Sequence, residues 1–187
     1  FPSPPKIGKK NIQMAGCVRW AGASVDTEKN VLYVSVDQFP YISTIIENKN
    51  FKGKYTHKWE YFVDKKNNPG IKPPWGAIVA LDLNLGKIKW KVPFGNFDEL
   101  KNIYNYNTGT TNRSGVTASR GNLIFASGTK DNKFRVFDSN NGDELWSYTM
   151  SKAGSAPPTV YEINGKQFIV VPAFENGGKE IYSFTLK

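Results

Sequence analysis

The chain has 187 residues, of which 39% are hydrophobic and 14% aromatic, which excludes intrinsic disorder, and its longest apolar runs are too short to cross a bilayer. Its formal net charge is +9 at pH 7, but the lysines are scattered along predicted loops and no basic helix accompanies them. This distribution argues against a nucleic-acid partner.

The first residues do not resemble a signal peptide, because residues 1–5 (FPSPP) lack a basic start and an apolar run. We therefore expect the sequence to start inside a longer chain. Cys17 is the single cysteine, so it forms no disulfide within the chain and is expected to be a small buried residue.

The first β-hairpin is predicted for residues 18–26 (VRWAGASVD) and 30–36 (NVLYVSV), where a turn separates two runs rich in β-branched and aromatic residues. Residues 38–74 break this pattern with lysines, asparagines and prolines, and are predicted to form a long surface insertion. A second hairpin follows at residues 76–94. The two hairpins together form one blade that the insertion interrupts.

A strand–turn–strand unit at residues 76–90 (GAIVALDLNLGKIKW) recurs at residues 131–146 (DNKFRVFDSNNGDELW). Its aspartate is expected to accept hydrogen bonds from the turn, its glycine to adopt the positive φ that the turn needs, and its tryptophan to anchor a neighbouring sheet. These three residues have identical spacing in both copies: Asp82, Gly86 and Trp90, and Asp138, Gly142 and Trp146. A repeated β-hairpin is typical of stacked blades or a solenoid.

The remaining strands are predicted in one group of four and one group of three: 114–119, 122–128, 133–138 and 144–149, then 158–163, 167–172 and 181–186. The second strands of these groups begin 45 residues apart, which is a propeller-blade period. We therefore predict an all-β fold of four-stranded antiparallel sheets, a single C-terminal propeller fragment over residues 1–187. Its parts are a blade at 16–94 with the insertion at 38–74, a blade at 113–150 and an incomplete blade at 155–187.

Several segments together carry a family resemblance: RWAGASVD at 19–26, PWG at 74–76 leading into ALDLNLGKIKW, LIFASGTKDNKFRVFDSNNGDELW at 123–146, and AGSAP at 153–157 followed by NGKQFIVV. With them the chain resembles the C-terminal part of pyrroloquinoline quinone (PQQ) dependent dehydrogenases, especially the glucose and quinate dehydrogenase branch. The repeated tryptophan units, or W-motifs, are only moderately specific alone, because other propellers contain them.

The resemblance implies an eight-bladed quinoprotein propeller, of which this chain supplies about three blades, with each W-motif tryptophan stacked on a neighbouring blade as an inter-blade clamp. It also implies a periplasmic protein that binds PQQ and calcium and oxidises a sugar or polyol such as glucose by hydride transfer to PQQ, with a quinone-type electron acceptor. Membrane attachment through a preceding region is an option. Most ligands are expected upstream, so no catalytic or metal-binding residue is assigned here and the isolated piece is expected to be inactive.

The same resemblance suggests four cofactor-binding residues: Arg19, Trp20, Asp131 and Asn132. Arg19 stands where the family usually has Asn or Glu; as a cation it either pairs with a PQQ carboxylate or lies at a solvated blade edge. Asp131-Asn132 either faces the cofactor funnel or is simply a turn pair. Arg19 is the expected partner of Asp131, and Lys130 is a weaker candidate that is more typical of a solvated turn.

A second function stays open, namely a cofactor-free W-motif propeller that acts as a protein-binding scaffold in the cell envelope. Such a scaffold would not need Arg19-Trp20 or Asp131-Asn132. Residues 173–178 are shorter than the glycine-rich loop of relatives near the substrate mouth, which leaves the substrate undetermined. His57 has no cysteine or carboxylate at metal-ligand spacing and is expected to be a solvated loop residue.

Overall fold

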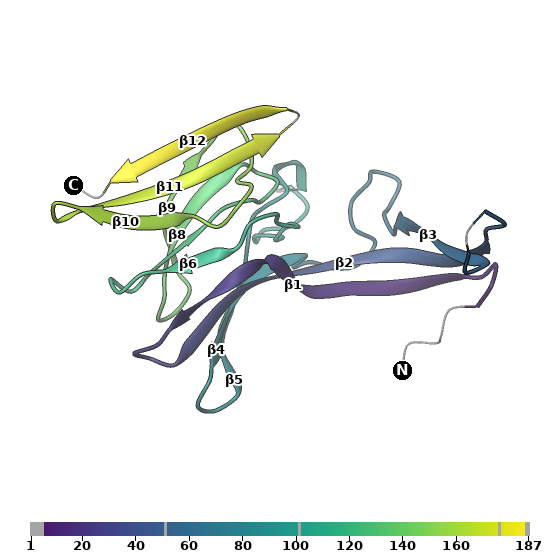
Figure 1. Cartoon of the computed structure of the whole chain (residues 1–187), viewed down its shortest axis with the longest axis horizontal. Helices are drawn as coiled ribbons and strands as arrows, with labels where there is room; N and C mark the ends of the chain where they lie inside the picture. The colour runs from purple at the N-terminus through teal and green to yellow at the C-terminus, as the bar shows by residue number, and fades with distance from the viewer. Residues whose placement is uncertain (1–5, 51, 101, 176, 186–187) are drawn as a thin grey trace. The chain divides into compact units, whose positions relative to one another are not determined.

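The computed structural model describes residues 6–50, 52–100, 102–175 and 177–185, without the side chains of residues 15–17, 19, 20 and 175. The chain forms two compact units. The blade unit comprises Cys17–Asp37 and Pro73–Lys187, and the insertion unit comprises Phe1–Gly16 and Gln38–Lys72. Two long paired strands, β1 (Lys10–Asp26) and β2 (Val31–Glu47), contribute to both units (Figure 1).

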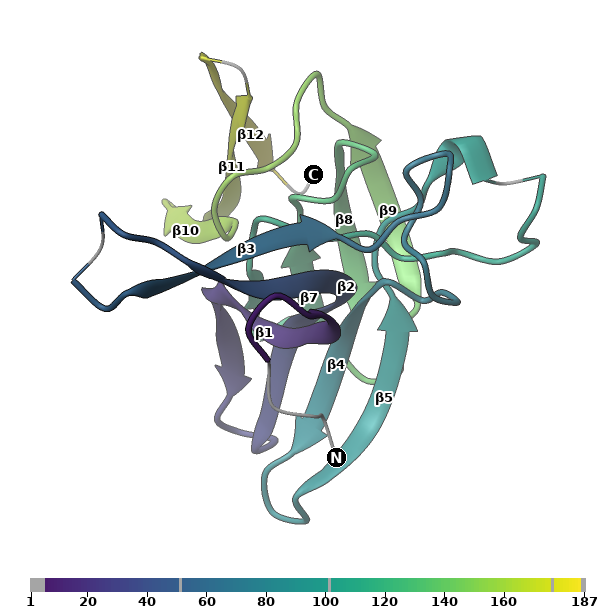
Figure 2. The same cartoon turned by 90° about the vertical axis from the view of Figure 1, so that its right-hand side faces the viewer.

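The first sheet of the blade unit has the order β1-β2-β4-β5, with β4 at Gly76–Asp82 and β5 at Lys87–Pro93. Figure 2 shows β4 and β5 as a twisted pair. The first five residues of β4 are buried, as its continuous run of small and apolar residues predicts for a strand packed on both faces. The predicted hairpin at this position is therefore confirmed.

Two further antiparallel sheets follow in chain order. The second has the order β6-β7-β8-β9, formed by Val116–Ala118, Leu123–Ala126, Lys133–Asp138 and Glu144–Thr149. The third has the order β10-β11-β12, formed by Thr159–Ile163, Lys166–Glu175 and Gly178–Thr185. The predicted all-β class is confirmed, and the bounds of β8 and β9 coincide with the predicted ones.

The two W-motif hairpins share one register. Ala80 pairs with Trp90 in the first, and Val136 pairs with Trp146 in the second. In both hairpins the register shifts directly after this pair, which marks a β-bulge or similar irregularity. The sequence repeat is thus a repeat of strand geometry, down to the position of the irregularity.

The turns that follow β4 and β8 explain why both copies of the unit have an aspartate at the same place. The Asp82 carboxylate accepts hydrogen bonds from the N–H groups of Asn84 and Leu85 at 2.9 and 3.0 Å. Asp138 accepts one from the N–H of Asn140 at 2.7 Å. Both aspartates therefore hold their turns, as predicted from the sequence.

Trp90 links the first sheet to the second. Its indole Nε1 donates a hydrogen bond to the carbonyl of Ser139, in the β8–β9 turn, at 3.0 Å. Its ring lies against Gly142, where an added Cβ would come within 2.8 Å of the indole. Gly142 also has a φ of +81°, so this turn needs glycine for its conformation as well as for the contact. The W-motif of the first sheet thus clamps the second.

Trp146 has the same register but a different environment. It is 45% exposed, and its ring meets Phe184 of β12 at a centroid distance of 5.7 Å. With Phe125 and Val136 of the second sheet and Ile169 of the third, it lines an apolar groove of about 520 Å³. Trp146 therefore contacts the neighbouring sheet, as the resemblance implies. It stays half exposed because the part of the chain that the structure describes has no counterpart of the 139–142 turn over it.

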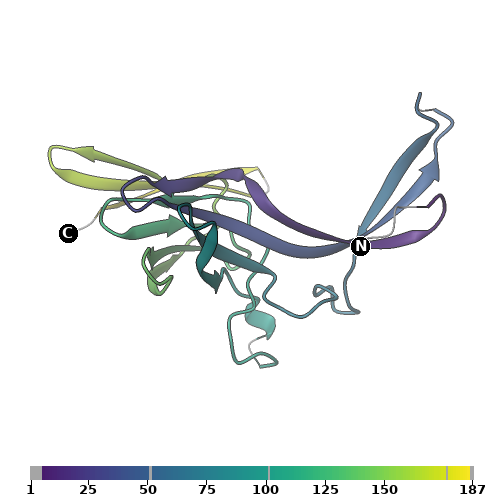
Figure 3. The same cartoon turned by 90° about the horizontal axis from the view of Figure 1, so that it is seen from below.

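The insertion unit contains regular strands. β3 (Tyr55–Tyr61) pairs with the second part of β2, from Tyr41↔Tyr61 to Glu47↔Tyr55, and is drawn in blue in Figure 3. β2 does not end at residue 36 as predicted, because residues 39–46 (FPYISTII) are also rich in β-branched and aromatic residues. This unit has ten lysines and three acidic residues, a formal charge of +7 out of +9. No helix among the described residues is long and apolar enough to cross a membrane.

Candidate functional site

Two connections meet at one end of the second sheet: the segment between β5 and β6, and the β7–β8 turn at residues 127–132. Asn112 of the first forms an isolated bridge with Thr129 of the second, and the N–H of Lys130 donates to the Thr110 hydroxyl at 3.2 Å. The buried polar residues of this end, which we call the polar end cluster, are Ser35, Asp37, Asn96, Thr108, Thr110, Asn112, Ser114, Ser127 and Thr129.

Side-chain hydrogen bonds in the polar end cluster link all three sheets of the blade unit. Asp37 of β2 accepts from the side-chain amide of Asn112 at 2.7 Å. The Ser35 hydroxyl donates to the carbonyl side of the same amide at 3.1 Å. The Ser114 hydroxyl donates to the carbonyl of Ala156, ahead of β10, at 2.7 Å. Buried polar groups need such partners, so the cluster fixes how these connections lie.

Close backbone approach at this end requires glycine. A Cβ on Gly76, the first residue of β4, would lie 1.9 Å from the carbonyl oxygen of Thr110. A Cβ on Gly109 would lie 2.1 Å from the carbonyl oxygen of Gly76, and Gly109 has a φ of +64°. The segment before β6 therefore runs in direct contact with the start of β4.

Asp131 is the centre of a buried ion-pair network. Its side chain is 2% exposed, and that of Arg135, on β8, is 6% exposed. The guanidinium donates from Nη1 and Nη2 to the two carboxylate oxygens at 3.1 and 2.5 Å, a bidentate pair. The carboxylate also accepts from the Thr129 hydroxyl at 2.6 Å, from the N–H of Asn96 at 3.0 Å and from the N–H of Lys133 at 3.3 Å.

The ion pair keeps both of its members charged. Burial alone would raise the pKa of Asp131, but the hydrogen bonds and charge of Arg135, with the Thr129 hydroxyl, outweigh it and place this pKa below its usual value. Burial would lower the pKa of Arg135, but Asp131 and Glu144 raise it. The ionised pair therefore stabilises the fold above the ordinary aspartate pKa of about 3.9, and this contribution is lost as the pH falls through the lower folded-state pKa.

The structure places the four predicted cofactor residues in two positions. Asp131 and Asn132 lie in the β7–β8 turn, where Asn132 adopts a left-handed φ of +56°. Arg19 and Trp20 lie in β1, but their side chains are outside the described part of the chain. Among the described side chains, the cation that contacts Asp131 is Arg135. The expected partner, Arg19, has its side chain outside the described part of the chain. Asp131 is thus both a turn residue and a buried ion-pair partner.

Two basic residues lie beside the β7–β8 turn: Arg113, which the sequence analysis did not single out, and Lys130, which it ranked as a weaker candidate. Arg113 is exposed between the buried residues 112 and 114, and its N–H donates to the carbonyl of Gly128 at 3.0 Å, which places it beside the β7–β8 turn. The Lys130 ammonium lies 2.8 Å from the Glu99 carboxylate and 4.3 Å from the Phe97 ring centre. The available signal in the sequence was the position of these two basic residues, each directly next to polar residues of the cluster.

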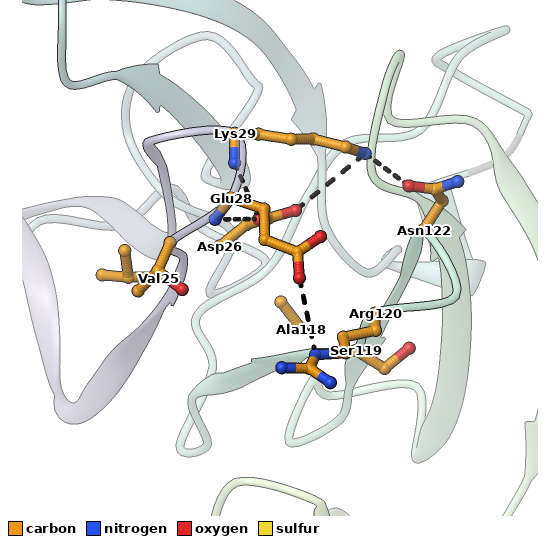
Figure 4. Close-up of a pocket in the computed structure, with 9 residues that line it drawn as sticks. Val25, Asp26, Glu28, Lys29, Ala118, Ser119, Arg120 and Asn122 are labelled. Carbon is orange, nitrogen blue, oxygen red and sulfur yellow. Dashed lines mark hydrogen bonds and ion pairs between the residues drawn. The ribbon is translucent and has the colours of Figure 1, made fainter.

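A second cleft, of about 240 Å³, lies at the opposite ends of β7 and β8 (Figure 4). The Lys29 ammonium points across it to the Asn122 side chain and lies 3.9 Å from the Asp26 carboxylate. Arg120 and Glu28 form a largely exposed pair at 3.6 Å. Because the Arg120–Glu28 ion pair and the Lys29–Asn122 hydrogen bond connect the first sheet with the second, we interpret the cleft as an inter-blade contact.

Within the described ranges no three His, Cys, Asp or Glu side chains lie close enough together to hold a metal ion. Asp131 has its carboxylate oxygens directed at Arg135, Thr129 and backbone N–H groups. The Asp131 carboxylate is therefore occupied by hydrogen bonds from the protein itself.

Comparison with known sequences shows the family to which the chain is related. Residues 9–169 match the PQQ family model described as glucose/ethanol/alcohol dehydrogenase, beta-propeller domain. The chain is 29% identical over 189 residues to the quinoprotein glucose dehydrogenase of Escherichia coli (strain K12), covering 87% of this chain and 24% of that protein. It is 31% identical over 211 residues to the glycerol dehydrogenase large subunit of Gluconobacter thailandicus, covering 91% and 28%. The chain spans about a quarter of the length of these relatives.

Solved structures agree on the fold. The crystal structure of quinohemoprotein alcohol dehydrogenase from Comamonas testosteroni superposes with a TM-score of 0.68 at 15% identity, covering 95% of this chain and 28% of that chain. A europium-containing methanol dehydrogenase gives 0.65 at 18% identity, covering 92% and 28%. These matches confirm the predicted propeller blades and the predicted resemblance, and the family match does not favour the cofactor-free scaffold. The chain belongs to the PQQ family of glucose/ethanol/alcohol dehydrogenase β-propeller domains.

Proposed function

We propose that this chain lines one side of the cofactor funnel in a PQQ-dependent dehydrogenase, and that the full-length protein oxidises a sugar or polyol such as glucose. The observation that carries the proposal is the family match over residues 9–169. Relatives with this region are named as glucose and glycerol dehydrogenases, which supports a polyhydroxylated substrate. The chain spans a quarter of those proteins, so the activity belongs to the whole protein.

Three residues next to the polar end cluster fit an anionic cofactor. PQQ carries carboxylates, and cationic or amide donors are the groups that bind carboxylate oxygens in proteins. The exposed Arg113, the Lys130 ammonium with its side chain 55% exposed, and the Asn132 amide would hold these oxygens. When bound, PQQ accepts the hydride, while the protein orients PQQ and provides the electrostatic environment around it.

The four residues named from the sequence take different parts in this proposal. Arg19 and Trp20 would face the cofactor from β1. Asn132 would present its side chain from the β7–β8 turn. Asp131 would act behind the binding surface, since its carboxylate is buried and already accepts hydrogen bonds from Arg135 and Thr129.

The remaining elements of the proposal concern the whole protein. Calcium would be bound next to PQQ by ligands from other blades, because the described part of this chain has no metal-ligand cluster. A quinone-type acceptor would take the electrons, and the protein would act in the periplasm. The remaining propeller blades are the immediate structural partners.

In the full-length protein, Arg113→Gln is expected to weaken PQQ binding by about tenfold, the effect of removing one charged hydrogen-bond donor. Arg120→Gln is the matched control, because Arg120 is 94% exposed at the opposite end of the second sheet. PQQ titration of the apo-protein and PQQ-dependent dye reduction with glucose measure the effect. An equal loss in both variants would contradict the placement of the site. A wild-type protein that binds no PQQ would overturn the function.

The isolated 187-residue chain is expected to give no turnover with PQQ, calcium, glucose and a dye acceptor. The physical reason is that the described residues include no metal-ligand cluster, and the buried carboxylate of Asp131 is held by Arg135. The full-length protein is the positive control in the same assay. PQQ-dependent dye reduction by the isolated chain would show that the catalytic groups lie within it.

A further inference from the structure

The Asp131–Arg135 network joins three separate pieces of the blade unit. Arg135 sits in the middle of β8, opposite Ala126 of β7 and Ser147 of β9. Its Nη1 and Nη2 reach back to the β7–β8 turn, and its Nε donates to the Glu144 carboxylate of β9 at 2.9 Å. Through Asp131 the same network holds the N–H of Asn96, in the segment that follows β5.

All donor nitrogens of the guanidinium are engaged. Nη1 also donates to the Thr129 hydroxyl at 3.1 Å, and that hydroxyl in turn donates to Asp131 at 2.6 Å. A planar guanidinium can meet these acceptors together, whereas a lysine ammonium would act as a point charge and could not reproduce the fork. The shape of the β7–β8 turn therefore requires the forked donor geometry of arginine as well as its positive charge.

The turn that this network holds is the one that presents Lys130 and Asn132. Residue 130 is tied to the segment before β6 through the Thr110 hydroxyl, and the N–H of Asn132 donates to the carbonyl of Thr129 at 3.1 Å. Asp131 lies between them, and its buried, ionised carboxylate is paired with Arg135. The network thus fixes the backbone on either side of Asp131, from which the exposed Lys130 and the partly buried Asn132 extend.

We propose that Arg135 is a positioning residue for PQQ, which acts by holding Asp131 and thereby the Lys130 and Asn132 side chains in the arrangement that the cofactor needs. This inference rests on the proposed function. It assigns a role to Arg135, a residue outside the predicted site. It also means that Asp131 holds the turn in place and does not contact PQQ directly. Supporting residues behind a binding surface typically change affinity or activity by about 10–100-fold when they are replaced.

Two variants of the full-length protein test the proposal. Arg135→Lys keeps a positive charge but removes the fork. The double variant Asp131→Leu with Arg135→Met removes both charges together, so that neither is left buried without a partner. Lys29→Met is the matched control, because Lys29 is the cation of a polar network at the opposite ends of the same strands.

The readouts are the melting temperature of the apo-protein, the PQQ dissociation constant of the folded protein, and kcat and KM with glucose. We expect Arg135→Lys and the double variant to weaken PQQ binding at least tenfold, with the substrate KM changed less than twofold. The double variant should melt within a few degrees of wild type, and Lys29→Met should leave PQQ affinity unchanged. A folded double variant with wild-type PQQ affinity would show that the network is only structural. If Arg135→Lys does not fold, the PQQ affinity of the double variant alone tests the proposal. Wild-type protein without PQQ affinity would overturn the proposed function instead.

Discussion

Gly109→Ala is expected to destabilise the blade unit by about 3–5 kcal/mol, at the upper end of single-substitution effects. The added Cβ would lie 2.1 Å from the carbonyl oxygen and 2.6 Å from the nitrogen of Gly76. These are backbone atoms of β4, and the carbonyl already accepts a hydrogen bond from the N–H of Phe94 at 3.0 Å. A flexible side chain could move aside, but here β4 would have to shift against β2 and β5.

Gly86→Ala is the matched control for this prediction. Gly86 has a φ of +62°, nearly the same as the +64° of Gly109, but a Cβ there has no atom within 4 Å. Its cost is therefore backbone strain alone, about 1–2 kcal/mol. Urea denaturation of the full-length protein should separate the two variants. Equal midpoints would show that the predicted clash with Gly76 is relieved by a small rearrangement.

Trp90→Ala is expected to cost about 3–4 kcal/mol, because the indole bridges two sheets and its removal leaves a cavity between them. The indole packs against Tyr33 with ring centres 5.9 Å apart, lies over Gly142 and donates to the Ser139 carbonyl. Trp90→Phe should recover most of this stability but lose the hydrogen bond, which contributes about 1 kcal/mol. Thermal and urea denaturation measure both variants.

Trp59→Ala provides a control with the same chemical change. Trp59 is 53% exposed on β3, where its ring meets the edge of Tyr61 at a centroid distance of 5.2 Å. The expected loss is about 1 kcal/mol or less, the range of an exposed aromatic pair. Trp146→Ala should fall between the two in this chain, since its ring is 45% exposed. A loss at Trp59 as large as that at Trp90 would contradict the assignment of Trp90 as the inter-sheet clamp.

The hairpins could be predicted from the sequence because their signals are local. Strand, turn and strand are consecutive in each W-motif, at residues 76–93 and 133–149, and the aspartate and glycine of each turn act within that window. The bounds of β8 and β9 therefore agree with the prediction to the residue. The continuation of β2 to Glu47 was missed, since polar and proline residues in the insertion concealed a run of strand-forming residues.

The site was predicted less completely, because its contacts join residues that are distant in the chain. The Asp131-Asn132 turn was found, but the sequence contained no indication that its carboxylate meets the N–H of Asn96, 35 positions earlier. Arg19 was the expected partner and its side chain lies outside the described part of the chain, whereas the observed pairing of Asp131 with Arg135, only four positions away, was not predicted. On a strand, the side chain of Arg135 could have pointed to either side of the sheet, and its direction depends on the register with β7 and β9.

The sequence by itself determined the all-β class, the repeated W-motif hairpins and the family, since these follow from short-range patterns and motif spacing. Only the tertiary structure decided that Trp90 is clamped by the 139–142 turn while Trp146 lines an open groove, and that Asp131 is buried in an ion pair. The physical reason is the same in each case. Burial and pairing depend on which distant segment packs against a side chain, and two residues with identical local patterns can meet different neighbours.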